Sequence, residues 1–121
     1  MTDSLKIHFG YQHQLKTMWK NGHLPTVQIG IYGDKLTKNN ISLEHLLPVS
    51  RGGRTEYPNL ALASQEKNHE RNASNIFLFT TEENIQQYLE QFKNIIIIDF
   101  NGNKYIEDLL RTLEKLKRRQ L

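Results

Sequence analysis

The sequence contains no cysteine, which excludes disulfide bonds and thiolate metal ligands. It also lacks a long apolar run, because the longest one, Ile95 to Ile98, is far shorter than the roughly 20 residues of a membrane-spanning helix. The opening residues, MTDSLKIHFG, show no basic region followed by an apolar stretch, so no signal peptide is evident. We therefore expect a cytoplasmic protein with no membrane partner.

The overall composition is typical of one small folded domain. The chain has 121 residues, of which 37% are hydrophobic and 24% charged, so a single domain with a modest core is expected. There are 16 Lys and Arg residues against 13 Asp and Glu, which gives a net charge of +3. This small positive excess suits a polyanionic partner but occurs in many ordinary proteins.

Three apolar patterns in the first half of the chain predict secondary structure. Apolar residues recur at helical spacing from Ser4 to Lys20, which indicates an amphipathic helix. Apolar and polar residues alternate from Val27 to Ile31 and again from Ile41 to His45, which predicts two strands. A polar loop that contains two glycines follows, from Ser50 to Tyr57.

A short apolar run and a polar segment complete the central region. Leu60 to Ala63 is predicted to form a strand that returns beside the first one. Ser64 is a suitable N-cap for a short helix from Gln65 to Arg71, because a serine oxygen can accept a hydrogen bond from the first helical turn.

The last third of the chain predicts a helix, a strand and a second helix. They span Thr81 to Phe92, Ile95 to Phe100 and Lys104 to Arg119. The second helix carries an apolar stripe made of Ile106, Leu109, Leu110, Leu113 and Leu116. The stripe either belongs to the core or, if it stays exposed, pairs with a second copy, so a homodimer through this helix is a candidate assembly.

Three polar residues in the central region have the chemistry of phosphodiester hydrolysis. A neutral histidine such as His45 can take a proton from water. The oxygens of Glu44 and Asn68 are hard ligands that suit Mg²⁺ or Mn²⁺. Because neighbouring residues on a strand point to opposite faces, Glu44 and His45 can serve one site only if the strand end twists.

The order of residues from position 44 onward resembles the HNH endonucleases. The motif residues, in chain order, are Glu44, His45, Pro48, Gly52, Gly53, Asn59, Leu60, Asn68 and Arg71. The resemblance covers about residues 29 to 72 and implies an α+β fold with a ββα-metal core. On this basis residues 1–121 form one domain, with an N-terminal helix in 1–24, the core in 25–75 and an α/β extension in 76–121.

The resemblance also implies a role for each motif residue. His45 would be the general base, and Glu44 and Asn68 would bind one divalent metal ion, Mg²⁺ or Mn²⁺. His69 is an alternative to Asn68 as a ligand. Asn59 would hold the loop that orients His45. The candidate contacts to the DNA backbone are Lys35, Arg51, Arg54, Lys67 and Arg71.

One feature of many relatives is missing from this chain. They carry two Cys-x-x-Cys pairs that bind a structural zinc ion, and the matching positions here are Ile29 with Tyr32 and Ser64 with Lys67. We therefore expect no structural zinc. Apolar packing and the flanking helices must hold the core together instead.

Two functions from different classes fit these residues. The first is a metal-dependent DNA endonuclease of phage, restriction or mobile-element type, which the complete set of base and metal ligands favours. The second is a non-cleaving DNA-binding module, or a subunit of a larger nucleic-acid-processing assembly. A weaker third reading makes residues 76–121 a protein-binding appendage.

Overall fold

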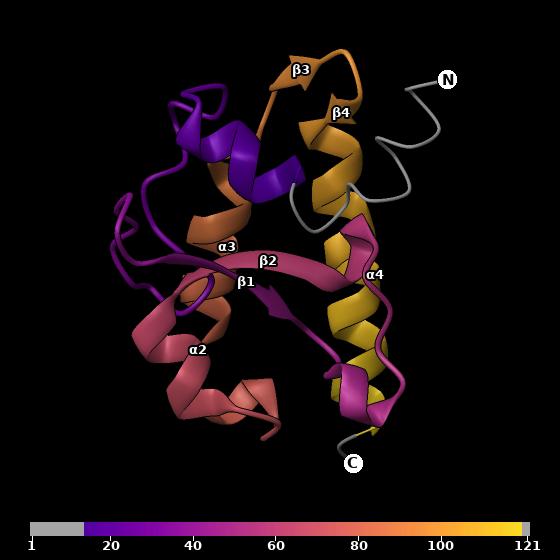
Figure 1. The fold of residues 1–121 in the computed structure, drawn as a ribbon. Coiled ribbons are helices and arrows are strands. Elements are labelled where there is room, and N and C mark those ends of the chain that lie inside the picture. Colours follow the sequence, from indigo (N-terminus) through magenta and orange to yellow (C-terminus); the bar gives the residue numbers. More distant parts are fainter. Residues whose placement is uncertain (1–13, 120–121) are drawn as a thin grey trace.

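A computed structural model of the protein describes residues 14–119 and has an α+β fold (Figure 1). Residues 14–20 are helical, and the rest of the helix predicted from Ser4 to Lys20 lies outside the described residues. The elements that follow are β1 (Ile41–His45), β2 (Leu60–Ser64), α2 (Gln65–Arg71), α3 (Glu82–Glu90), β3 (Ile96–Ile97), β4 (Phe100–Asn101) and α4 (Gly102–Arg119). Single turns of 3₁₀ helix lie at η1 (Val49–Arg51), η2 (Tyr57–Asn59) and η3 (Ile76–Leu78).

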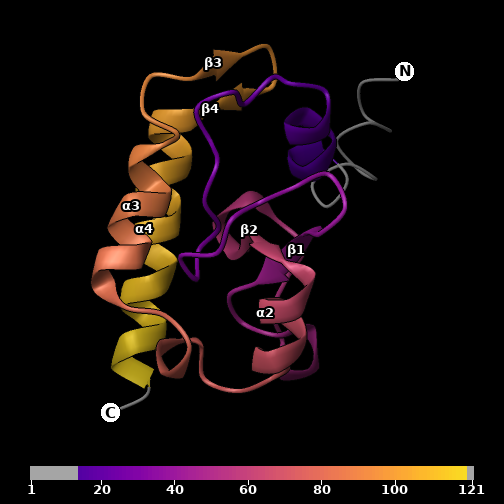
Figure 2. The ribbon, with the colours of Figure 1, turned by 90° about the vertical axis from the view of Figure 1, so that its left-hand side faces the viewer.

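The centre of the fold is a hairpin of two strands followed directly by a helix. β1 and β2 are antiparallel, with Ile41 opposite Ser64 and His45 opposite Leu60. Ser64 ends β2 and caps α2, because its hydroxyl oxygen accepts a hydrogen bond from the Lys67 N–H at 3.2 Å. The strands predicted at Ile41 to His45 and Leu60 to Ala63, the predicted helix and its N-cap are therefore confirmed. Figure 2 shows α3 and α4 together on one side of the hairpin, with α2 below it.

The strand predicted from Val27 to Ile31 is wrong. Only an isolated bridge joins Ile29 to Lys35, and the segment between them turns back on itself. Val27 and Ile31 are almost fully buried, so the apolar alternation reflects burial of every second side chain rather than strand pairing. As a result β2 pairs with Ile41–His45 and not with the first predicted strand.

The free edge of β2 is bonded by two tyrosines from the helical layer. The Tyr88 hydroxyl of α3 accepts a hydrogen bond from the Leu62 N–H at 2.9 Å, and the Tyr105 hydroxyl of α4 donates to the Leu60 carbonyl at 2.6 Å. The two hydroxyls also bond each other at 2.8 Å. Ile31 donates its N–H to the Leu62 carbonyl at 3.0 Å. These bonds let every residue of β2 be buried without leaving its edge unpaired.

The C-terminal part forms its two predicted helices but not its predicted strand. The residues from Ile95 to Phe100 form a tight hairpin, in which β3 pairs with β4. The chain folds back here because the Gly102 N–H donates to the Ile95 carbonyl at 2.7 Å. A side chain at Gly102 would lie 2.0 Å from the Phe92 carbonyl oxygen, so glycine is needed for this close approach.

The apolar stripe of α4 is mostly covered by the protein itself. Leu109, Leu113 and Leu116 are at most 5% exposed, whereas Leu110 is 48% exposed. The exposed stripe that would have supported a homodimer is therefore absent from α4. Among residues 14–119, no helix is long and apolar enough to cross a membrane.

Two segments of the chain match the zinc-binding pairs of relatives, and the Asp34 carboxylate links them. One oxygen of Asp34 accepts a hydrogen bond from the Tyr32 N–H at 3.1 Å, and the other accepts from the Ser64 N–H. Asp34 also accepts the Gly30 N–H on its own carbonyl at 2.7 Å, which closes the turn. Hydrogen bonds to one carboxylate thus link the two segments that a zinc ion would link.

The flanking helix α3 holds the same turn from the other side. Gln91, just after α3, accepts the N–H groups of Gln28 and Ile29 and donates to the Ile29 carbonyl, each at 2.8 Å. Thr80, just before α3, donates to the Ile31 carbonyl at 2.6 Å. The prediction that flanking helices support the core is confirmed, and side-chain hydrogen bonds do much of this work.

We predict that Asp34→Ala lowers the free energy of unfolding by about 1.5–3 kcal/mol, because two backbone N–H groups lose a charged acceptor. Asp34→Asn keeps one oxygen acceptor and should lose less. Urea denaturation measures both. Glu107→Ala, which removes an exposed carboxylate on α4, is the matched control and should be nearly neutral. An equal effect of Asp34→Ala and Glu107→Ala would contradict this role of Asp34.

Candidate functional site

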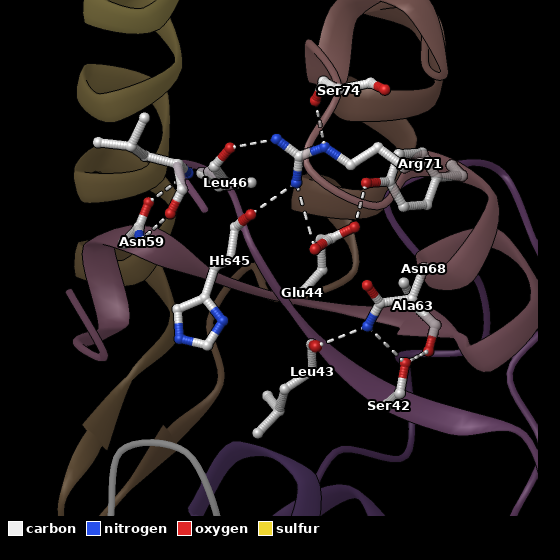
Figure 3. A network of polar contacts seen from close by, with 12 residues as sticks. Ser42, Leu43, Glu44, His45, Leu46, Asn59, Ala63, Asn68, Arg71 and Ser74 are labelled. Atoms are coloured by element: carbon white, nitrogen blue, oxygen red, sulfur yellow. Dashed lines mark hydrogen bonds and ion pairs between the residues drawn. The ribbon is translucent and has the colours of Figure 1, made fainter. Parts of the chain in front are cut away.

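Strand β1 sends its two candidate functional side chains in different directions. Glu44 is 4% exposed and points towards Arg71, whereas the half-buried ring of His45 points away from both (Figure 3). Adjacent residues on a strand point to opposite faces, and this alternation continues to the end of β1, so Glu44 and His45 lie on different faces. The structure therefore divides the predicted site into two groups of residues.

The first group is built on the Glu44 carboxylate. One of its oxygens lies 3.2 Å from the Arg71 guanidinium, and the other accepts a hydrogen bond from the Tyr32 hydroxyl. Burial raises the pKa of Glu44, and the contacts with Tyr32 and Arg71 oppose this rise. Burial also raises the pKa of Tyr32, so its hydroxyl keeps the proton that it donates.

Arg71 is buried and does not lie on a nucleic-acid-binding surface, so its predicted contact with phosphate is wrong. Its side chain is 2% exposed. The guanidinium donates to the carbonyls of His45 and Leu46, each at 2.7 Å, and to the Ser74 carbonyl at 2.6 Å. The planar donor set of arginine thus fastens the end of α2 to the residues where β1 ends.

Asn68 is also bonded to β1. Its amide nitrogen donates to the Leu43 carbonyl at 2.8 Å and to the Ser42 hydroxyl at 3.1 Å (Figure 3). Its neighbour His69 is exposed on α2. Asn68 therefore connects the middle of α2 to the strand, as Arg71 connects its end.

The predicted divalent ion does not fit this arrangement. An ion bound to Glu44 would lie close to the Arg71 guanidinium, and the two positive charges would repel each other strongly at low solvent exposure. Within residues 14–119, no three His, Asp or Glu side chains gather as a metal-ligand cluster. Metal binding by Glu44 and Asn68 remains a prediction from the resemblance.

The second group is built on His45. Its Nε2 lies 3.0 Å from the hydroxyl oxygen of Thr55 in the loop between the strands. Burial lowers the pKa of His45, and the positive charge of Arg71 lowers it further. The neutral imidazole is therefore favoured, and this is the form that can accept a proton.

Asn59 forms hydrogen bonds with the chain on both sides of the loop around His45. Its amide oxygen accepts the Leu47 N–H at 2.8 Å, and its amide nitrogen donates to the carbonyls of Leu47 at 3.0 Å and Arg54 at 2.9 Å. Its own carbonyl accepts the Leu46 N–H at 2.9 Å. One buried side chain therefore fixes both the residues that follow His45 and the loop that faces it.

The geometry of this loop explains why Gly52 and Gly53 are both glycine. A side chain at Gly53 would lie 1.7 Å from the Leu47 carbonyl oxygen, so only glycine lets the loop pass there. Gly52 has a φ of +94°, in the left-handed region that other residues avoid.

The remaining predicted DNA contacts are exposed to different degrees. Arg51 and Arg54 are exposed in the loop that carries Thr55, and Lys35 is exposed at the turn before β1. Arg54 forms only a weak, solvent-exposed ion pair with Glu56 at 3.4 Å. The side chain of Lys67 on α2 is 43% exposed.

Three important residues were not singled out as functional by sequence reasoning. Tyr32 occupies a position that matches a zinc ligand of relatives. The sequence therefore indicated that Tyr32 lies in the core, but not that it donates a hydrogen bond to Glu44. Asp34 follows a glycine in a turn, which is an ordinary setting for Asp. Thr55 lies in a polar loop, and nothing in the sequence indicates its contact with His45.

Comparisons with protein-family models, with curated proteins and with solved structures gave no match.

We predict that Arg71→Ala lowers the free energy of unfolding by about 3–5 kcal/mol, because it leaves the buried Glu44 carboxylate without its positively charged partner. The double variant Glu44→Gln with Arg71→Met removes both charges and should recover part of this loss. Urea denaturation at neutral pH measures each variant. Lys117→Ala breaks an exposed ion pair with Glu82 and should leave stability almost unchanged. Strictly additive effects of the Glu44 and Arg71 substitutions would show that the pair is not coupled.

Proposed function

We propose that this chain is an HNH-type nuclease domain that hydrolyses phosphodiester bonds in DNA, with His45 as the general base. The observation that carries the proposal is the setting of the His45 imidazole. It is half-buried, its pKa is lowered by burial and by the Arg71 charge, and a loop that Asn59 fixes contacts it. The order of β1, β2 and α2, with the motif residues placed along it, supports a ββα-metal type of core.

The proposed reaction is attack of water on phosphorus. His45 accepts a proton from the attacking water while the water oxygen bonds to phosphorus. The bond from phosphorus to the sugar oxygen breaks, and that oxygen takes a proton from solvent. Arg51 and Arg54, exposed in the loop beside His45, are the groups proposed to offset the negative charge of the phosphate. No step is assigned to a metal ion, because the Glu44 carboxylate is already paired with Arg71.

The second candidate function is a DNA-binding module that does not cleave. The specific observation in its favour is the same ion pair, since a metal ion at Glu44 would compete with the Arg71 charge and with the Tyr32 hydroxyl. A catalytic histidine without a metal would leave the charge on the leaving oxygen poorly stabilised. The two candidates therefore differ in whether the protein cuts DNA, not in whether it binds DNA.

We predict that His45→Ala lowers the rate of plasmid cleavage by about 10²–10⁴-fold, the usual effect of losing a general base. The assay uses supercoiled plasmid with Mg²⁺, Mn²⁺ or Ni²⁺ in separate reactions. His23→Ala, which removes an exposed histidine just after the N-terminal helix, is the matched control and should cleave at the wild-type rate.

Two results would overturn the nuclease proposal. A folded His45→Ala protein that cleaves like the wild type would remove His45 from catalysis. A wild-type protein that binds plasmid but cuts it with none of the three ions would favour the non-cleaving module.

We predict that affinity for duplex DNA falls steeply with salt, because the proposed contacts are cations that face phosphates. Each contact contributes about 0.9 to the slope of log affinity against log salt, so Arg51→Ala with Arg54→Ala should reduce the slope by roughly 1.8. A fluorescence anisotropy titration measures it. Lys20→Ala with Lys93→Ala removes the same charge from other exposed positions and should change the slope much less. Equal changes in the two double variants would place the DNA elsewhere.

A further inference from the structure

The His45 ring has one nitrogen engaged and one nitrogen open. Nε2 lies 3.0 Å from the Thr55 hydroxyl oxygen. Nδ1 has no hydrogen-bond partner among residues 14–119. The two nitrogens of a neutral imidazole have opposite roles, since one carries the proton and the other accepts one. The partner of Nε2 therefore decides which nitrogen is free to act as a base.

The contact with Thr55 is imposed by the fixed loop rather than by a chance position of an exposed side chain. Asn59 donates to the carbonyl of Arg54, the residue directly before Thr55, at 2.9 Å. Earlier in the loop, Gly53 donates its N–H to the Pro48 carbonyl at 3.0 Å and passes against Leu47. These bonds hold the backbone on the approach to Thr55, so its hydroxyl is presented to His45 from a defined direction.

Only one of the two hydrogen-bond directions leaves a working base. If Thr55 donated to Nε2, then Nδ1 would carry the proton and the ring would have no open acceptor. If Nε2–H donates to Thr55, the lone pair of Nδ1 is open to a water molecule. Protonation of Nδ1 in the reaction would then leave the bond from Nε2–H to Thr55 in place, so the ring would not need to turn.

We propose that Thr55 is a positioning residue, which accepts the Nε2–H of His45 and leaves Nδ1 as the nitrogen that takes the proton from water. The choice of tautomer and the role of Nδ1 rest on the proposed nuclease function, whereas the contact between Thr55 and Nε2 does not. Thr55 acts through His45 and is not itself assigned a bond to the reacting atoms.

The tautomer is measured by two-bond ¹H–¹⁵N correlation spectra of the imidazole in ¹⁵N-labelled protein, at a pH where His45 is neutral. We expect the wild type to show a protonated Nε2 and an unprotonated Nδ1. Thr55→Val keeps the shape of the side chain but removes the hydroxyl, so the ¹⁵N shifts should move towards the average of two tautomers. Thr55→Ser keeps the hydroxyl and should restore the wild-type shifts. Thr17→Val, the same change on the N-terminal helix, should have no effect.

Cleavage assays then separate this inference from the proposed function. If the domain is a nuclease, Thr55→Val should lower kcat by about 10–100-fold with little change in KM, and Thr55→Ser should recover most of it. A wild-type protein with the proton on Nδ1, or unchanged ¹⁵N shifts in Thr55→Val, would overturn the role of Thr55 whatever the activity. The expected shifts in a protein that does not cleave would support Thr55 and overturn the nuclease.

Discussion

The buried ion pair between Glu44 and Arg71 is the interaction on which the rest of this structure depends. Two charges with almost no exposure to solvent are tolerated only when each has close partners, and here Tyr32 and three backbone carbonyls supply them. Because Arg71 bonds the carbonyls of His45 and Leu46, the pair fixes the angle between α2 and the end of β1. The Arg71 bond to the His45 carbonyl also holds the backbone from which the His45 ring leaves the strand. Loss of one partner would therefore disturb the candidate base as well as the stability of the fold.

A domain without cysteine needs another means of joining the first turn to the start of α2. In this chain, several neutral and charged side chains make the hydrogen bonds that join these two segments. Asp34 links the backbone at Tyr32 and Ser64, and Gln91 and Thr80 bond the same turn from both ends of α3. Each such bond contributes on the order of 1 kcal/mol, so several are needed where a structural zinc ion would contribute far more. The C-terminal extension is therefore part of the support of the core.

Much of the fold could be predicted from the sequence, because the signals that worked are local. The apolar periods gave β1, β2, α3 and α4, and the serine at position 64 gave the start of α2. Alternation failed for 27–31, since it reports which side chains are buried and not whether a second strand lies alongside. The apolar run at 95–100 failed for another reason, because it folds into a tight hairpin in which Ile96 and Ile98 are 73% and 95% exposed. Arg71 was also misplaced. From sequence alone, a basic residue at a motif position is expected at the surface. Its buried acidic partner, Glu44, is distant in the chain and could not be recognised from local sequence.

The two groups of the candidate site lie on different faces of β1, yet they are not independent. Arg71 donates to the carbonyl of His45, and its charge lowers the pKa of the His45 ring on the other face. A cation buried beneath a strand can therefore lower the pKa of a base on the other face without touching the ring itself. Thr55 reaches the same ring from the loop and sets which nitrogen is open. Two features therefore act on His45: the positive charge of Arg71 lowers its pKa, and the contact with Thr55 sets which ring nitrogen is open. The two features come from different parts of the chain.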